Sequence, residues 1–160
     1  KKKNNNKDFG LIIGDNVFIG NNTIVQKGVG RDAIIGEGTV VNNVCNLGHD
    51  LSIGKNCTIG LSTSISGYTN IADNVYIAPG VTISNRVNIG SHSFIGIGSL
   101  VLSDIEDFTK VVGRPAKNIN ARRKGSNLDK IFNDSPWIRA SKNKLKKFAL
   151  VRKLHELMFR

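Results

Sequence analysis

The chain has 160 residues, enough for one sizeable core, and a formal net charge of +11 at pH 7. The charge lies at the ends, because residues 121–160 carry 12 Lys and Arg against 3 Asp and Glu, whereas residues 11–120 carry 7 against 8. No apolar run reaches the roughly 18 residues of a membrane span and the first residues lack the apolar stretch of a signal peptide, which argues against a membrane protein and leads us to expect a cytoplasmic one.

Residues 1–10, "KKKNNNKDFG", form a polar basic N-terminal tail. Residue 1 is lysine and the single methionine is Met158, so the sequence leaves room for a further domain upstream of this chain.

From residue 11 an aliphatic residue recurs at every sixth position. The series is Ile13, Ile19, Val25, then Ile35, Val41, Leu47, Ile53, Ile59, Ile65, Ile71, Ile77, Ile83, Ile89, Ile95 and Val101. Neither the helical period nor plain strand alternation predicts this spacing. A period of six fits a short strand followed by a tight corner, with three such hexads closing one triangular coil. Asn and Gly in "GDN", "GNN", "GKN" and "ADN" suit those corners. We therefore predict an all-β parallel β-helix over residues 11–119, stabilised coil against coil as in other solenoids.

The period is interrupted once, between Val25 and Ile35, where "QKGVGRDA" carries four extra residues. We expect a loop pushed out from a corner. It is either part of a binding face or a tolerated surface insertion.

Cys45 and Cys57 occupy repeat positions that should point inward, and their spacing matches no metal motif. We interpret them as buried thiols in a reducing compartment.

The hexads, together with the turn "CNLGHDLSIG" at residues 45–54, resemble the hexapeptide-repeat acyltransferases. The closest resemblance is to UDP-3-O-acylglucosamine N-acyltransferases of lipid A synthesis and to nucleotide-amino-sugar N-acetyltransferases. The resemblance covers about residues 11–119. It implies a left-handed β-helix, an exception to the usual right-handed crossover, and a homotrimer.

In the resembled families the histidine of this turn is the general base, which identifies His49 as the candidate. His49 is the third residue of its hexad, at a corner where side chains point outward. The alternative to a general base is therefore a histidine that only faces solvent. One coil of three hexads onward lies Gly67, whose N–H would stabilise the oxyanion, or which serves only the turn. Asp50 would orient the imidazole or merely cap the corner.

Two further residues are candidates for the acceptor side. Asp32, in the inserted loop, is a rival orienter of the imidazole, and Asn43 matches an asparagine near the active-site turn of the resembled families. His92 should face solvent at another corner and His155 lies in the tail. The three histidines are not spaced for a metal, so we predict none.

After the last hexad, "VVGRPAKNI" at residues 111–119 resembles the closing segment of members that use acetyl-CoA. In those relatives the coenzyme lies in a groove between subunits, along stacked corners. The residues that the resemblance assigns to the donor are Ser66, Gly67, Ser84 and Asn85, with Arg114 and Lys117 for the 3′-phosphate. The alternative for both cations is ordinary surface charge.

Residues 120–160 form a basic, partly helical C-terminal extension, with Leu150, Val151, Leu154, Leu157 and Met158 at helical spacing. Three uses remain open: packing on the β-helix or its trimer partners, docking of an acyl carrier protein, or adhesion to an anionic membrane surface. Nucleic acid is not expected, since no interleaved aromatic residues accompany the charge.

Taken together, the residues and the resemblance predict transfer of an acyl group, favouring acetyl from coenzyme A, to the amine of a nucleotide-linked amino sugar. A carrier-protein-dependent N-acyltransferase of lipid A-like synthesis and a non-catalytic binding module are the alternatives.

Overall fold

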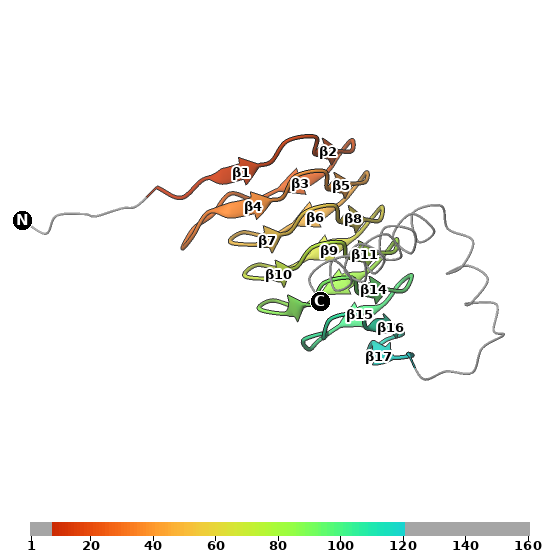
Figure 1. Ribbon diagram of the computed structural model, residues 1–160. Helices are drawn as coiled ribbons and strands as arrows, with labels where there is room; N and C mark the ends of the chain where they lie inside the picture. The colour runs from red at the N-terminus through yellow and green to blue at the C-terminus, as the bar shows by residue number, and fades with distance from the viewer. Residues whose placement is uncertain (1–7, 121–160) are drawn as a thin grey trace, which may run out of the picture. The chain divides into compact units, whose positions relative to one another are not determined.

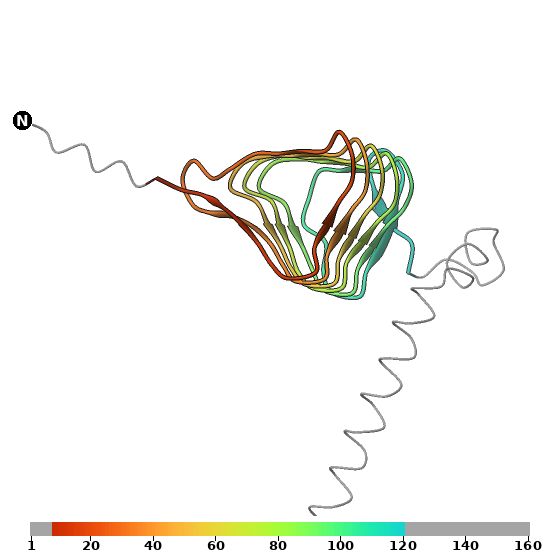
Figure 2. The same ribbon diagram turned by 90° about the horizontal axis from the view of Figure 1, so that it is seen from above.

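The computed structural model describes residues 8–120, and these residues form a solenoid of short strands. Successive coils stack along one axis, as Figure 1 shows, and Figure 2 shows their triangular outline. The predicted parallel β-helix of hexapeptide repeats is therefore confirmed. The segment 121–160, with its predicted helix and its proposed partners, lies outside the described residues, as do residues 1–7 of the N-terminal tail.

Each side of the triangle is a sheet that takes one strand from each coil. Sheet A contains β1 (Leu11–Ile13), β4 (Ala33–Ile35), β7 (Ser52–Ile53), β10 (Asn70–Ile71) and β13 (Asn88–Ile89). Sheet B contains β2 (Phe18–Ile19), β5 (Val40–Val41), β8 (Thr58–Ile59), β11 (Tyr76–Ile77), β14 (Phe94–Ile95), β16 (Lys110–Val112) and β17 (Lys117–Asn118). Sheet C contains β3 (Ile24–Val25), β6 (Asn46–Leu47), β9 (Ser64–Ile65), β12 (Thr82–Ile83) and β15 (Leu100–Val101). Pairing is parallel except between β16 and β17.

The core is the predicted column of sixth-position aliphatic side chains. From Ile35 to Val101 every one of them is at most 3% exposed. In the first coil, Ile13 is 48% exposed and Ile19 and Val25 are partly buried. Each coil thus buries the aliphatic side chains of its neighbour, which is the nearest-neighbour stabilisation expected of a solenoid.

Position five of the hexads also points inward and carries a second, polar function. Thr39, Cys45 and Cys57 each direct the side-chain oxygen or sulfur to a backbone carbonyl of the following coil, at Gly54, Gly60 and Ala72. These contacts satisfy corner carbonyls inside the core. Burial raises the pKa of Cys45, and it raises the pKa of Cys57 to about 11, so both cysteines are the buried free thiols that the sequence predicted.

The corners repeat one backbone conformation. In each, the second turn residue has positive φ, a conformation that favours glycine and asparagine. Between sheets A and B the positions include Asn16, Asn56 and Asn74, with φ of 57°, 53° and 59°. We call this column the Asn corner.

The register departs from three hexads per coil in two places. The insertion between β3 and β4 was predicted. The second change was not: Ile105 forms a bridge with Ile89, so the corner after β15 is two residues shorter than the others. The strands extend from Leu11 to Asn118, inside the predicted range 11–119.

Candidate active site

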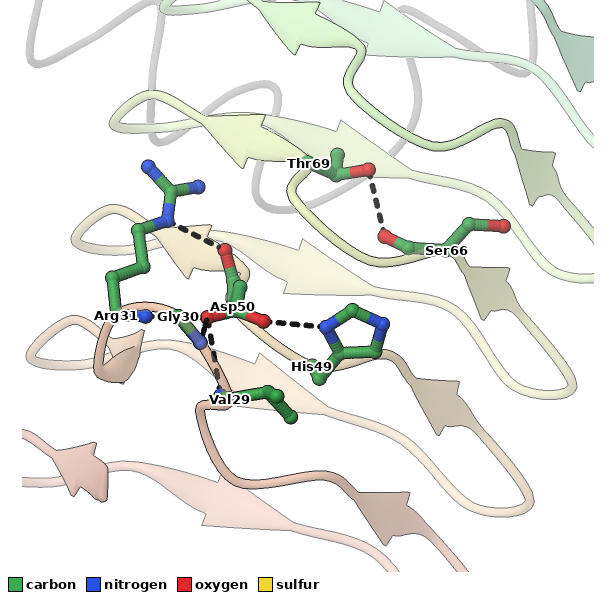
Figure 3. Close-up of polar contacts among 7 residues, drawn as sticks. All are labelled: Val29, Gly30, Arg31, His49, Asp50, Ser66 and Thr69. Carbon is green, nitrogen blue, oxygen red and sulfur yellow. Dashed lines mark hydrogen bonds and ion pairs between the residues drawn. The ribbon is translucent and has the colours of Figure 1, made fainter. Parts of the chain in front are cut away.

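His49 lies in the turn between β6 and β7, where sheet C passes to sheet A. We call this column the site corner; it comprises residues 48–51, 66–69 and 84–87. The His49 side chain is 41% exposed, so it is not part of the core. Its Nδ1 lies 2.5 Å from Oδ2 of Asp50 (Figure 3). The Asp50 side chain is fully buried, and its backbone has a positive φ of 57°.

The other carboxylate oxygen of Asp50 is enclosed by the inserted loop, residues 26–32. Consecutive backbone N–H groups of Val29, Gly30 and Arg31 donate to Oδ1 at 3.1, 2.6 and 2.6 Å (Figure 3). Such a run of N–H groups is an anion-binding nest. Burial acts to raise the pKa of Asp50, but the hydrogen bonds from His49 and from the nest outweigh it and hold the pKa well below the ordinary value. Asp50 is therefore a carboxylate at neutral pH.

An ionised carboxylate only accepts hydrogen bonds, which fixes the tautomer of a neutral His49. Nδ1 carries the proton and donates a hydrogen bond to Asp50, so Nε2 keeps its lone pair. The Nε2 edge faces Gly67, one coil onward: a Cβ added there would lie 2.9 Å from Nε2 and 3.0 Å from Cε1. Gly67 thus leaves the basic nitrogen uncovered.

The backbone of Gly67 offers a hydrogen-bond donor at the same place. Tyr68 N–H donates to the His49 carbonyl at 3.0 Å, which sets Gly67 directly against the His49 turn. Among residues 8–120 no protein group accepts the N–H of Gly67. The backbone of Gly67 therefore packs against the turn that carries the basic nitrogen.

The sequence did not single out Tyr68 and Arg86, which continue this column. The Tyr68 ring meets the His49 ring edge-on, with centroids 5.3 Å apart, and Arg86 Cζ lies 5.3 Å from the Tyr68 centroid. Both residues have positive φ, as Asp50 has. The signal was available, since Tyr68 and Arg86 follow Asp50 at successive steps of three hexads.

The structure stacks the predicted donor-binding residues at the site corner. Ser66 N–H donates to the carbonyl of Ile83, directly before Ser84, and Thr69 Oγ1 bridges the carbonyls of Ser66 and Ser84 at 2.8 and 3.2 Å. Figure 3 shows the contact between Thr69 and Ser66. The side chain of Ser84 contacts Asn85 Oδ1 at 3.3 Å.

Arg114 and Lys117 lie in the hairpin of β16 and β17, and both are exposed. The hairpin attaches to sheet C, because Leu100 of β15 donates to the Gly113 carbonyl and accepts from Ala116 N–H. Both cations thus lie in a hairpin that contacts Ser99 and Leu100, where the chain enters β15 from the corner between sheets B and C.

Two predicted residues make their contacts away from the imidazole. Oδ1 of Asp32 accepts the N–H of Gly10 at 2.7 Å, so Asp32 does not orient His49 in this structure; the residue that contacts Nδ1 is Asp50. Asn43 lies at the corner between sheets B and C, and its Oδ1 accepts the N–H of Asn21 at 2.9 Å. The six-residue period does not predict where the Asp32 side chain lies, because Asp32 belongs to the inserted loop, which does not repeat.

His92 lies at the Asn corner, stacked on Phe108 with centroids 4.9 Å apart. Within residues 8–120 no group of three or more His, Cys, Asp or Glu side chains is arranged to hold a metal ion, and no helix there is long and apolar enough to cross a membrane.

Comparison with known proteins agrees with the repeat. The family model described as "Hexapeptide repeat of succinyl-transferase" matches residues 10–43 and 50–85. A UDP-3-O-acylglucosamine N-acyltransferase of Methylobacterium nodulans is 46% identical over 41 residues, which is 26% of this chain and 12% of that protein. The chain thus matches only a small part of the length of such relatives.

Two solved structures share the fold. A hexapeptide transferase family protein from Anaplasma phagocytophilum superimposes with a TM-score of 0.67 at 23% identity, over 90% of this chain and 81% of that one. A mutant of perosamine N-acetyltransferase from Caulobacter crescentus, solved with CoA and GDP-perosamine, gives 0.54 at 23% identity, over 69% and 54%. The repeat and the solenoid are thus those of hexapeptide-repeat proteins, and the chain is similar to acyltransferases built on this repeat.

Proposed function

We propose that this chain transfers an acyl group, acetyl from coenzyme A, to the amine of a nucleotide-linked amino sugar, with His49 as the general base. The observation that carries the proposal is the Asp50–His49 pair, because the buried carboxylate holds Nδ1 and leaves Nε2 free on the side that faces Gly67. A base with one nitrogen oriented by a carboxylate is the arrangement that general-base catalysis needs.

The reaction would proceed through a tetrahedral intermediate. The acceptor nitrogen attacks the thioester carbonyl carbon while His49 Nε2 removes a proton from that nitrogen. The carbonyl π electrons move to oxygen, and the Gly67 N–H donates to the resulting oxyanion. Collapse of the intermediate breaks the C–S bond, and the imidazolium returns the proton to the thiolate. The products are an amide and a free thiol.

The coenzyme and the acceptor are supported by the comparisons, by residues of the site corner and by the cations of the β16–β17 hairpin. The perosamine N-acetyltransferase structure contains CoA and a nucleotide sugar. In this chain, Ser66, Ser84 and Asn85 form a stacked column beside His49, and Arg114 and Lys117 provide cations for a phosphate. Asn43 lies at another corner, between sheets B and C, and Asp32 accepts the N–H of Gly10; we keep both as candidates for acceptor binding, Asn43 through a neighbouring subunit.

We also propose a homotrimer. Val44, Leu61 and Ile97 are 54%, 52% and 69% exposed along the corner between sheets B and C. An apolar stripe of this kind is a surface that a second copy of the chain would cover.

The similarity to UDP-3-O-acylglucosamine N-acyltransferase favours a second candidate, a carrier-protein-dependent N-acyltransferase. Calorimetric titration of the full chain with acetyl-CoA, and separately with an acylated carrier protein, distinguishes the two. Saturable coenzyme binding that weakens in Arg114→Ala or Lys117→Ala supports the first, and binding of the carrier protein alone supports the second. Binding of neither would favour a non-catalytic module.

A further inference from the structure

Arg31, in the inserted loop, connects three coils through one side chain. Its Nε donates to the backbone carbonyl of Asp50 at 2.8 Å, and its Nη2 donates to Oδ1 of Asn70 at 2.7 Å. Its own backbone N–H is the third donor of the nest that holds Asp50. Arg31 therefore contacts both the backbone and the carboxylate of the residue that orients His49.

The contact to Asn70 continues across the outer face of sheet A. Nδ2 of Asn70 donates to Oδ1 of Asn88 at 2.8 Å, and Nδ2 of Asn88 donates to Oδ2 of Asp104 at 3.1 Å. Because a guanidinium has only donors, it orients the first amide, and each amide then orients the next. The chain of hydrogen bonds begins at a cation and ends at a carboxylate, so every group in it has a complementary partner.

The loop needs such an anchor because the nest exists only while the loop stays closed over Asp50. Gly28 N–H and Ala33 N–H both donate to the Gly10 carbonyl, which attaches the two ends of the loop to the first coil. The tip, Val29 to Arg31, faces the second coil instead. The guanidinium contacts to Asp50 and Asn70 attach this tip to the end of the second coil and to β10 in the fourth.

We propose that Arg31 is a positioning residue: it locks the loop tip over Asp50, so that the nest directs the second carboxylate oxygen at Nδ1 of His49. The proposal rests on the proposed function for its effect on catalysis, but its structural core is the state of the imidazole. Without the guanidinium the tip opens, water reaches Asp50 and the imidazole loses its fixed orientation. Since a displacement of about 1 Å at a catalytic group can reduce a rate roughly 100-fold, we expect Arg31→Ala to lower kcat by about 10- to 100-fold with little change in donor binding.

The matched control is Lys27→Ala. Lys27 is a cation of the same loop, but its ion pair at 3.0 Å is with the exposed Asp8, away from the nest. It should leave both kcat and the imidazole unchanged. Asn70→Ala removes only the far end of the Arg31 anchor and should lower kcat in the same direction by a smaller factor. Arg31→Lys keeps the charge but cannot bridge Asp50 and Asn70 together, so it should recover at most part of the loss.

The decisive readout is the NMR signal of the His49 ring in the full chain, identified by its loss in His49→Gln. Wild type and Lys27→Ala should show a protected Hδ1 resonance and a single tautomer. Arg31→Ala and Asn70→Ala should lose that protection while keeping the amide spectrum of the fold. A protected, unchanged Hδ1 in both variants would overturn the proposal. Loss of Hδ1 protection in a chain that transfers no acyl group would sustain the positioning role and reject the proposed function instead.

Discussion

Two corners of the same triangular coil impose the same backbone on very different side chains. At the Asn corner the positive-φ position holds asparagine in three coils, at Asn16, Asn56 and Asn74, whereas at the site corner it holds Asp50, Tyr68 and Arg86 at φ of 57° to 61°. Asparagine enters this region at low cost, but tyrosine and arginine do so against their intrinsic preference.

The side chains of the site corner differ from those of the Asn corner in their contacts. The ring of Tyr68 lies between His49 and Arg86, and Asp50 accepts four hydrogen bonds through its carboxylate. Positive φ is also found at Val44, His92 and Phe108 in the other corners, so the contacts, and not the backbone conformation, distinguish the site corner. The following experiments test whether the two corners differ in this way.

The largest contrast should be between the two histidines. His49→Ala removes the base and should lower turnover by about 100- to 10,000-fold without affecting assembly or donor binding. His92→Asn, at the Asn corner, keeps a residue suited to positive φ and should leave turnover unchanged. Steady-state acyl transfer and size-exclusion chromatography measure both effects. Equal losses in the two variants would mean that the corners do not differ in function.

Substitutions of two glycines test separately the effect on the active site and the effect on backbone conformation. Gly67 does not have positive φ, so Gly67→Ala should change stability little. Its methyl group would press on Nε2 and Cε1 of the His49 ring, displace the ring and so reduce turnover. Gly98, at φ 64°, has open space around the position of a Cβ, so Gly98→Ala should cost about 1 kcal/mol of stability and spare activity. Denaturant titration and turnover together test the pair. A Gly67→Ala enzyme with full activity would show that the imidazole does not need this edge.

Much of the fold was predictable because one interaction repeats. The sixth-position aliphatic residues specified the coil, and the predicted core from Ile35 to Val101 is buried. The short corner after β15 was not predicted, because Ile105 follows Val101 after four residues and so does not fit the six-residue period. The period predicts the repeating coils, but it does not predict segments in which the chain departs from the repeat.

The same reasoning explains what was found of the site. His49 and Gly67 belong to the repeat, so a count of three hexads placed them together. The partners of Asp50 come from the inserted loop, whose path depends on contacts that no period encodes, and Arg31 was missed for that reason. The sequence leaves Asp50 either to orient the imidazole or to cap the corner, and the contacts of the nest show that it is buried and ionised.

The smallest expected effect concerns acid stability, tested by Asp50→Asn and the reciprocal Asn74→Asp. Although burial acts to raise the pKa of Asp50, its hydrogen bonds hold it below the ordinary value near 3.8, the value expected after unfolding. The ionised carboxylate therefore contributes stability that is complete above this value and is lost as the pH falls below it, because the unfolded chain then binds a proton that the folded chain does not.

Denaturant midpoints measured at equal protein concentration, from neutral pH to about pH 3, test this sign. Wild type should lose stability below about pH 4 more steeply than Asp50→Asn, which has no proton to bind at this position. Asn74→Asp should follow the wild-type curve, because the Asn corner provides no nest for a carboxylate. Asp104, whose pKa is lowered by hydrogen bonds from Asn88, remains in all three chains and gives a common background. Parallel curves for wild type and Asp50→Asn would mean that the nest does not favour the charged form, and the distinction between the two corners would then rest on His49 and Gly67 alone.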